Sequence, residues 1–128
     1  MASSSKTSGG GGRPTARNSF VAGSVKFGSQ GTYNGEKRIM VEARQASEKY
    51  AGTVLELRRR RDAGPNEWEI VVPARTWAGE TPRSIARPRS LREQKGIAER
   101  LIMNARTPER IRGLLTATKA PRWATKAR

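Results

Sequence analysis

The residues of this 128-residue chain that could do chemistry are mostly arginines, and they occur in runs. The densest run is Arg58-Arg59-Arg60-Arg61. A second cationic stretch consists of Arg83, Arg87, Arg89, Arg92 and Lys95, with no acidic residue between Arg83 and Arg92. A planar guanidinium group binds phosphate through two parallel hydrogen bonds and also stacks on bases. Both stretches therefore predict contacts with the phosphates of a nucleic acid.

A third cationic group lies at the C-terminal end, where no acid follows Arg110. Its members are Arg110, Arg112, Lys119, Arg122, Lys126 and Arg128, with Trp123 among them. An aromatic ring surrounded by cations can stack on a base while the cations hold the phosphates. The alternative is that Trp123 packs back onto the preceding helices.

Catalysis is disfavoured because the chain contains neither histidine nor cysteine. The commonest general base, the thiol nucleophile and the usual zinc ligands are therefore missing. Glu67 and Glu69 have the spacing of a carboxylate pair, but we interpret them as part of a solvated strand face. The glycine run 9–12 lacks the Lys-Ser/Thr of a phosphate-binding loop. We expect no enzymatic activity, no catalytic residue, no cofactor and no metal site.

The overall charge supports a polyanionic partner. There are 26 Lys and Arg residues against 11 Asp and Glu, a net charge of +15. Residues 1–35 hold four basic residues and no acid, residues 36–72 hold eight and seven, and residues 73–128 hold fourteen and four. Such asymmetry is typical of nucleic-acid binding. No apolar run approaches the roughly 18 residues of a membrane span, so we expect no membrane partner.

The elements that must position these residues can be predicted from periodicity. Alternating apolar residues predict four strands, at 20–27, 37–44, 53–60 and 67–72, with Asn34-Gly35 as a hairpin turn. Residues 77–89 are expected to form an ordered loop or a single helical turn. Ser90 and Glu93 have the spacing of a capping box and predict a helix to Asn104. Thr107-Pro108-Glu109 predicts a second helix, which ends before Pro121.

The predicted fold class is α+β, with a four-stranded antiparallel β-meander followed by two C-terminal helices. Strand alternation places four arginines on the exposed face of the sheet beside Met40, namely Arg38, Arg44, Arg58 and Arg60. Such a face could carry a single-stranded backbone. The alternative is that these arginines form ion pairs with Glu42, Glu56, Glu67 and Glu69 on the same face.

We divide the chain into a disordered, basic, Ser- and Gly-rich arm (1–18), a single α+β nucleic-acid-binding domain (19–119) and a basic tail (120–128). The arm lacks the apolar stretch of a secretory signal, although its composition overlaps with that of organelle transit peptides. We expect an intracellular or virion location, with organelle import as an alternative. The small core leaves homo-oligomerisation open as a source of stability.

The predicted function is binding of RNA or single-stranded DNA, mainly through phosphate contacts and with low sequence specificity. The predicted architecture resembles the Whirly-like single-strand binders. The arm, the sheet and the two helices, with the stretch from Glu36 to Gln45, also resemble the coats of single-stranded RNA phages. One alternative is therefore a coat or nucleocapsid protein that packages a genome, and another is a ribosomal or other ribonucleoprotein component. A helix-turn-helix reader of duplex DNA is less favoured, since the predicted turn lacks glycine.

Overall fold

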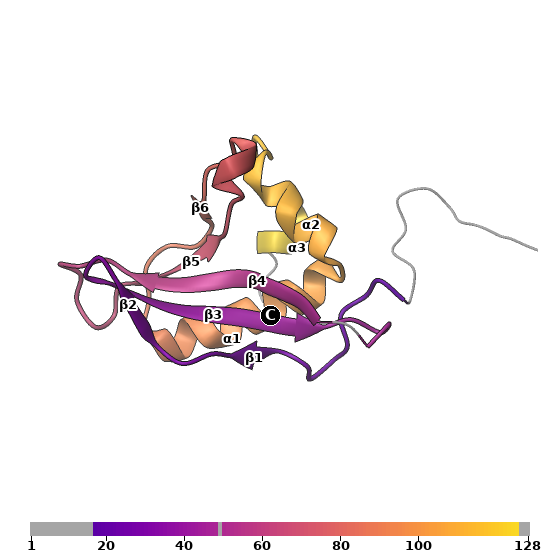
Figure 1. Cartoon of the computed structure of the whole chain (residues 1–128), viewed down its shortest axis with the longest axis horizontal. Helices are drawn as coiled ribbons and strands as arrows, with labels where there is room; N and C mark the ends of the chain where they lie inside the picture. The colour runs from indigo at the N-terminus through magenta and orange to yellow at the C-terminus, as the bar shows by residue number, and fades with distance from the viewer. Residues whose placement is uncertain (1–16, 49, 126–128) are drawn as a thin grey trace, which may run out of the picture.

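The computed structural model describes residues 17–48 and 50–125, which form an antiparallel sheet and several short helices (Figure 1). The six strands lie in the order β1-β3-β4-β5-β6, and β2 also pairs with β3. Their bounds are β1 (Lys26–Phe27), β2 (Gly31–Tyr33), β3 (Glu36–Arg44), β4 (Tyr50–Arg59), β5 (Trp68–Val72) and β6 (Arg83–Ser84).

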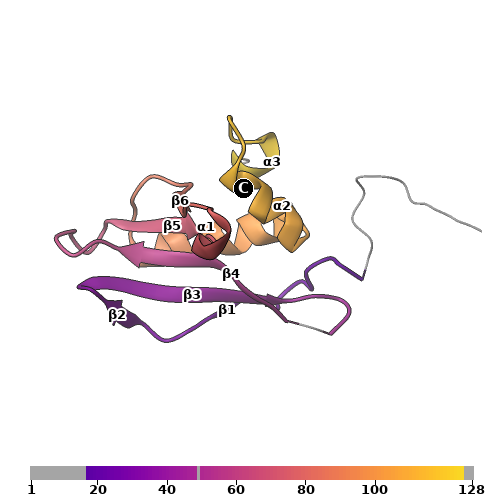
Figure 2. The ribbon, with the colours of Figure 1, turned by 45° about the horizontal axis from the view of Figure 1, so that its top comes forward.

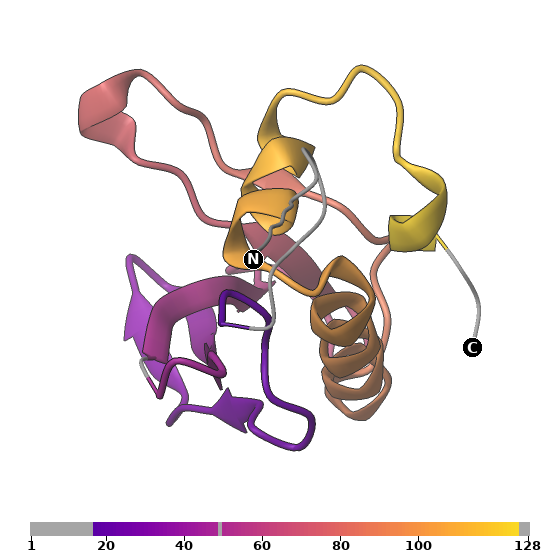
Figure 3. The ribbon, with the colours of Figure 1, turned by 90° about the vertical axis from the view of Figure 1, so that its right-hand side faces the viewer.

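All the helices except η2, which lies between β5 and β6, follow the strands in the chain. Figure 3 views the sheet from one end and shows the longest helix, α1, packed along one face. The bounds are η2 (Thr76–Ala78), α1 (Leu91–Ala105), α2 (Pro108–Arg112), η3 (Gly113–Leu115) and α3 (Arg122–Thr125), of which η2 and η3 are 3₁₀ turns.

The core lies between α1 and the inner face of the sheet. Alternate residues of β3, β4 and β5 point to this face and are buried, including Val41, Leu55, Leu57 and Ile70. The helix supplies the opposing side chains Ala98, Leu101, Ile102 and Ala105. This period of two against a helical stripe is the pattern that the sequence displays, and it removes the apolar side chains from water.

The hairpin between β2 and β3 has the turn that Asn34-Gly35 predicts. Tyr33 pairs directly with Glu36, and the two residues between them have φ values of 54° and 83°. Two consecutive left-handed residues define a type I′ turn, whose twist matches that of the strands it joins. Figure 2 shows β1 and β2 along the same side of β3, so that they form one interrupted edge.

The α+β class is confirmed, but the sheet has six strands rather than four. The segment predicted as a strand over 20–27 pairs only at Lys26–Phe27 and at an isolated bridge between Phe20 and Gln45. A turn closed by the hydrogen bond from the Ser24 N–H to the Val21 carbonyl interrupts it, with Gly23 at a φ of 76°. The strands β2 and β6 lie in segments that the sequence pattern describes only as turn or loop.

The helices begin where the capping signals predict. The Ser90 hydroxyl accepts a hydrogen bond from the Glu93 N–H, and the Glu93 carboxylate caps Ser90 in return. The second helix is shorter than predicted, because α2 ends at Arg112 and continues only as the 3₁₀ turn η3. Part of the predicted tail forms α3, whereas residues 1–16 of the predicted arm (1–18) and residues 126–128 of the tail lie outside the described residues.

A buried glutamine joins α1 to Trp68, the first residue of β5. Gln94 is fully buried, and its side-chain amide donates to the carbonyls of Trp68 (2.7 Å) and Arg87 (3.0 Å). The backbones of Trp68 and Arg89 also exchange two hydrogen bonds, of 2.9 and 3.0 Å. Because a buried amide is costly without partners, these bonds fix the segment that precedes α1 against the sheet.

Two glycine substitutions test this description in opposite directions. Gly35→Ala should lower the free energy of unfolding by about 1 kcal/mol, because a Cβ is strained at positive φ. Gly96→Ala, in the middle of α1 with open space around the added Cβ, should raise it by roughly 0.5–1 kcal/mol. Urea unfolding followed by circular dichroism measures both. Equal effects of the two substitutions would contradict the assigned turn.

Candidate nucleic-acid interface

The two arginine-rich stretches of the sequence meet at one end of the sheet. Lys37 pairs with Arg59, Arg59 with Trp68, and Trp68 with Arg89, across neighbouring strands and the bridge beside them. With neighbouring strands about 4.8 Å apart, the backbones of Arg59 and Arg89 lie only about 10 Å apart. This end of the sheet, at the left of Figure 1, holds the β2–β3 and β4–β5 turns and the start of α1. We call it the arginine end and define it as Lys37, Arg59, Arg60, Arg61, Arg87, Arg89 and Arg92.

Charge at the arginine end is poorly compensated. Of its members only Arg60 forms an ion pair between described residues, with Glu69 at 3.5 Å, and the Arg60 side chain is 75% exposed. The Arg59 guanidinium donates two hydrogen bonds to the Ala63 carbonyl, at 3.1 and 3.0 Å. The nearby carboxylates Glu67 and Glu93 keep their negative charge, but their described hydrogen bonds go to the backbone and to Ser90. Glu67 accepts from the Gly64 N–H at 2.7 Å, and Glu93 caps α1. Arg87 and Arg92 are exposed, so their guanidinium groups are accessible to a polyanion.

An open hollow lies beside these arginines. Its lining comes from the β4–β5 turn and from the segment leading into α1, and consists of Asn66, Arg87, Pro88, Arg89, Ser90 and Glu93. The Gln94 amide holds the Arg87 carbonyl, and the Trp68 backbone holds that of Arg89, so the backbone carrying these two arginines is fixed. A fixed backbone lets the guanidinium groups meet phosphate at a lower cost in conformational entropy.

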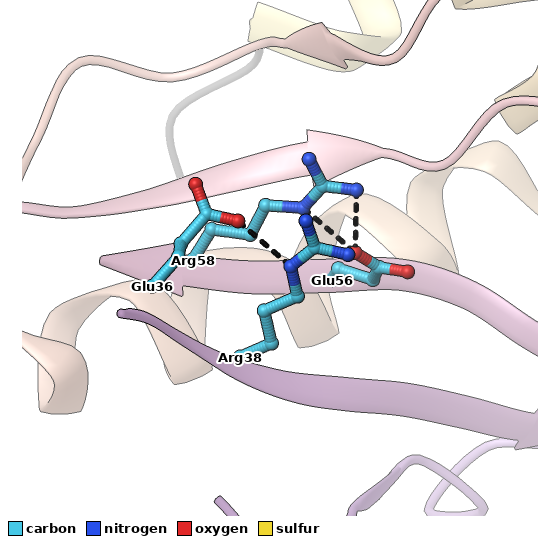
Figure 4. A network of polar contacts seen from close by, with 4 residues as sticks. All are labelled: Glu36, Arg38, Glu56 and Arg58. Carbon is cyan, nitrogen blue, oxygen red and sulfur yellow. Dashed lines mark hydrogen bonds and ion pairs between the residues drawn. The ribbon is translucent and has the colours of Figure 1, made fainter. Parts of the chain in front are cut away.

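The central arginines of the outer face, by contrast, are paired with acids. Arg38 and Arg58 lie directly opposite each other on β3 and β4. Figure 4 shows that each guanidinium binds the carboxylate two residues earlier in its own strand, Glu36 for Arg38 and Glu56 for Arg58, each at 2.7 Å. Glu56, expected on the solvated face, is only 8% exposed. The ion-pair interpretation of this face is therefore confirmed in part: Glu56 and Glu69 pair as expected, Glu36 pairs although it was not among the expected acids, and no ion pair of Glu42 or Glu67 forms between described residues.

Exposed aromatic side chains follow the same outer face. Tyr33, Met40 and Tyr50 are 45%, 38% and 49% exposed, and Trp77 is the other large apolar side chain that is exposed among the described residues. The guanidinium of Arg38 lies 5.2 Å from the ring centre of Tyr33, and the ammonium of Lys26 lies 5.2 Å from that of Tyr50. We call these five residues, Lys26, Tyr33, Arg38, Met40 and Tyr50, the aromatic strip.

The tyrosines of the strip escaped prediction because both belong to turns in the sequence pattern. A shallow hollow joins most of the strip, lined among others by Lys26, Tyr33, Arg38 and Met40. The signal for Tyr33 was present in the sequence, since the Asn34-Gly35 turn places it opposite Glu36 at the end of a strand. Tyr50 depends on the irregular pairing of β3 with β4 near Arg44, which no local pattern indicates.

Several of the cations predicted to bind nucleic acid are instead engaged within the chain. The Arg83 guanidinium donates to the carbonyls of Leu114 (2.5 Å) and Ala117 (2.7 Å). Arg112 pairs with Glu80. The Lys95 ammonium lies 5.4 Å from the ring centre of Phe27. These groups hold loops and helices together.

The tail is arranged as the packing alternative describes. Trp123 is half-buried against α1, its carbonyl accepts from the Asn104 amide, and Arg110 lies 5.1 Å from its ring centre. Lys119 and Arg122 are exposed, and Arg44 is half-buried on β3. Lys126 and Arg128 lie outside the described residues.

The connection between β5 and β6 forms a braced loop that sequence reasoning did not single out. Residues 73–82, here the Trp77 loop, project from the body of the molecule (Figure 3). The Glu80 carboxylate accepts from the Arg75 N–H at 2.8 Å and from the Arg112 guanidinium of α2. Arg83 ties the end of the loop to η3 through the two carbonyls named above. The loop carries the exposed indole of Trp77, whose exposure the sequence pattern did not indicate.

The described part of the chain shows neither a candidate metal site nor a candidate membrane-spanning helix. Residues 17–48 and 50–125 hold no cluster of three or more acidic, histidine or cysteine side chains that could bind a metal ion. None of the helices described has the length and apolar character needed to cross a bilayer. No protein-family model matches the sequence, and comparisons with curated proteins and with solved structures find no match either.

The brace of the Trp77 loop should depend on pH. The Arg112 hydrogen bond, and after it the Arg75 N–H, hold the pKa of Glu80 below its ordinary value of 4.5. Because the folded-state pKa is lowered, the brace is complete above about pH 4.5 and is lost as the pH falls through the lowered pKa. Glu80→Gln removes the charge that holds Arg112 and should therefore reduce, at neutral pH, the hydrogen-exchange protection of the backbone amides at positions 79 and 80. Glu99→Gln, on the exposed side of α1, is the matched control and should leave that protection unchanged.

Proposed function

We propose that this protein binds single-stranded nucleic acid, RNA or single-stranded DNA, mainly through phosphate contacts and with low sequence specificity. The observation that carries the proposal is the convergence of two arginine stretches, distant in sequence, at one weakly compensated end of the sheet. A net charge of +15 adds long-range attraction for any polyanion. The local clustering supports phosphate contacts beyond that general attraction.

The aromatic strip supports a single-stranded ligand over a duplex. Tyr33 begins the strip close to the arginine end, because it pairs with Glu36 next to the β2–β3 turn. Unpaired bases can stack on tyrosine rings, whereas bases within a duplex already stack on each other. The cations of the strip lie against its rings, and Arg38 also pairs with Glu36 outside the strip, so stacking rather than net charge would hold the bases there. Stacking is tolerant of sequence, which supports low specificity.

The geometry of α2 argues against duplex recognition by a helix-turn-helix. The helix has five residues, Pro108–Arg112, and its Ile111 is buried in the core. One of its arginines, Arg112, pairs with Glu80, and the other, Arg110, lies against Trp123. A recognition helix must present several free side chains to the major groove. This helix has neither the length nor the free side chains for that role.

Removing two arginines from the arginine end should weaken binding in a salt-dependent way. Arg87→Ala combined with Arg92→Ala should lower the affinity for single strands and reduce the slope of log K against log salt by about 1.4, at about 0.7 per phosphate contact. Filter binding with an oligothymidylate across a salt series measures both quantities.

The matched control is Arg100→Ala with Arg106→Ala, which removes the same charge from exposed positions outside the arginine end. It should change the slope much less. Equal slopes for the two double variants would mean that net charge alone drives binding, against a localised site. If the affinity of the wild-type protein did not change with salt concentration, phosphate contacts would be excluded as the source of binding.

The aromatic strip can be tested separately from the charge. Tyr33→Ala and Tyr50→Ala should each weaken binding of single strands by up to about 1–3 kcal/mol, the cost of one lost stacking contact. Each corresponding phenylalanine variant should retain most of the affinity because the ring remains. Fluorescence anisotropy with labelled single-stranded and duplex oligonucleotides measures the effect. A loss that is equal for both ligands would contradict a stacking role.

A further inference from the structure

Trp77 is the most exposed large apolar side chain among the described residues, at 82%. It lies in η2, at the tip of the Trp77 loop, which leaves the sheet after Val72. Since β5 begins at the arginine end with Trp68 and finishes at Val72, the loop stands at the opposite end of this strand. An indole this exposed contributes little to the core and is accessible to a partner outside the chain.

The loop is held in a defined conformation. Its turn is closed by hydrogen bonds from the N–H groups of Ala78, Gly79 and Glu80 to the carbonyls of Arg75 and Thr76, at 2.9 to 3.2 Å. Gly79 caps the turn with a φ of 80°. The side-chain braces from Arg112 and Arg83 fix it further to α2 and η3. A contact made by a prepared loop costs less ordering entropy than one made by a mobile segment.

The surroundings of Trp77 fit a nucleobase better than a protein surface. Stable protein interfaces bury about 800 Å² on each partner around an apolar centre, whereas one indole supplies about 150–250 Å². Its exposed neighbours in the loop are small or cationic: Arg75, Thr76, Ala78 and Gly79. The charge of Arg75 acts on the Glu80 carboxylate, but Arg75 is exposed and forms no ion pair with a described residue, so its guanidinium can also meet a phosphate beside a stacked base.

We propose that Trp77 is a second base-stacking site, with Arg75 contacting the adjoining phosphate, and that it binds the part of a single strand that extends beyond the arginine end. This proposal rests on the proposed function. It adds a dependence on ligand length, because a short strand held at the arginine end does not reach the loop. A longer strand occupies both sites and gains affinity from their linkage.

The test compares the wild-type protein with Trp77→Ala and Trp77→Phe, using labelled thymidylate oligomers of about four and about sixteen nucleotides. Fluorescence anisotropy gives the affinities. We expect Trp77→Ala to weaken binding of the long oligomer about fivefold or more, and Trp77→Phe to restore most of the loss. Neither variant should change binding of the short oligomer or of a long abasic strand, which offers phosphates without bases. Circular dichroism should show an unchanged fold for both.

Unchanged binding of the long oligomer by Trp77→Ala would overturn this proposal while leaving the proposed function intact. An equal loss on the abasic strand would also overturn it, since stacking could not then be the cause. A change of molecular mass by light scattering in Trp77→Ala, with unaltered binding, would assign Trp77 to contact between copies of the chain instead. A wild-type protein that binds neither oligomer would reject the proposed function itself, and this inference with it.

Discussion

The side-chain amide of Gln94 lies buried between α1 and β5 and donates to two carbonyls from separate segments of the chain. Through the Trp68 carbonyl it holds the helix to the sheet, and through the Arg87 carbonyl it holds the segment that leads into the helix. The Trp68–Arg89 bridge completes the contact. Together with the β5–β6 pairing and the hydrogen bond from the Ile85 N–H to the Ile70 carbonyl, these contacts fix the second arginine stretch relative to the first. The candidate interface therefore depends in part on an uncharged buried amide, because this amide helps to set where the charges lie.

The cations of this protein fall into two groups that composition alone does not separate. Arg38, Arg58, Arg83 and Arg112 are bound by carboxylates or carbonyls of the chain and act as cross-links within the fold. Those of the arginine end have few such partners. Two consecutive like-charged pairs, Lys37 with Arg59 and Arg38 with Arg58, lie across β3 and β4. Acids relieve the second pair but not the first, so an external anion would be most favourable at the first.

Local patterns in the sequence predicted the parts of the fold that depend on neighbouring residues. Strand alternation located the buried side chains of β3 to β5, the Asn34-Gly35 pair located the hairpin, and Ser90 with Glu93 located the start of α1. The sequence could not indicate that Arg83 would reach the carbonyls of Leu114 and Ala117, over thirty positions away. Nor could the sequence indicate that Tyr50 would lie beside Lys26. Both contacts depend on strand register and helix placement, which are properties of the whole fold.

The two edges of the sheet share a feature with a different consequence. One edge is split into β1 and β2, of two and three residues, and the other is β6, of two. Short, interrupted edge strands offer little unpaired backbone onto which a strand from another molecule could add. A polyanion concentrates basic proteins along its length, where long open edges would invite aggregation. Neighbouring copies of this chain would therefore offer each other little edge backbone from which to build a continuous sheet.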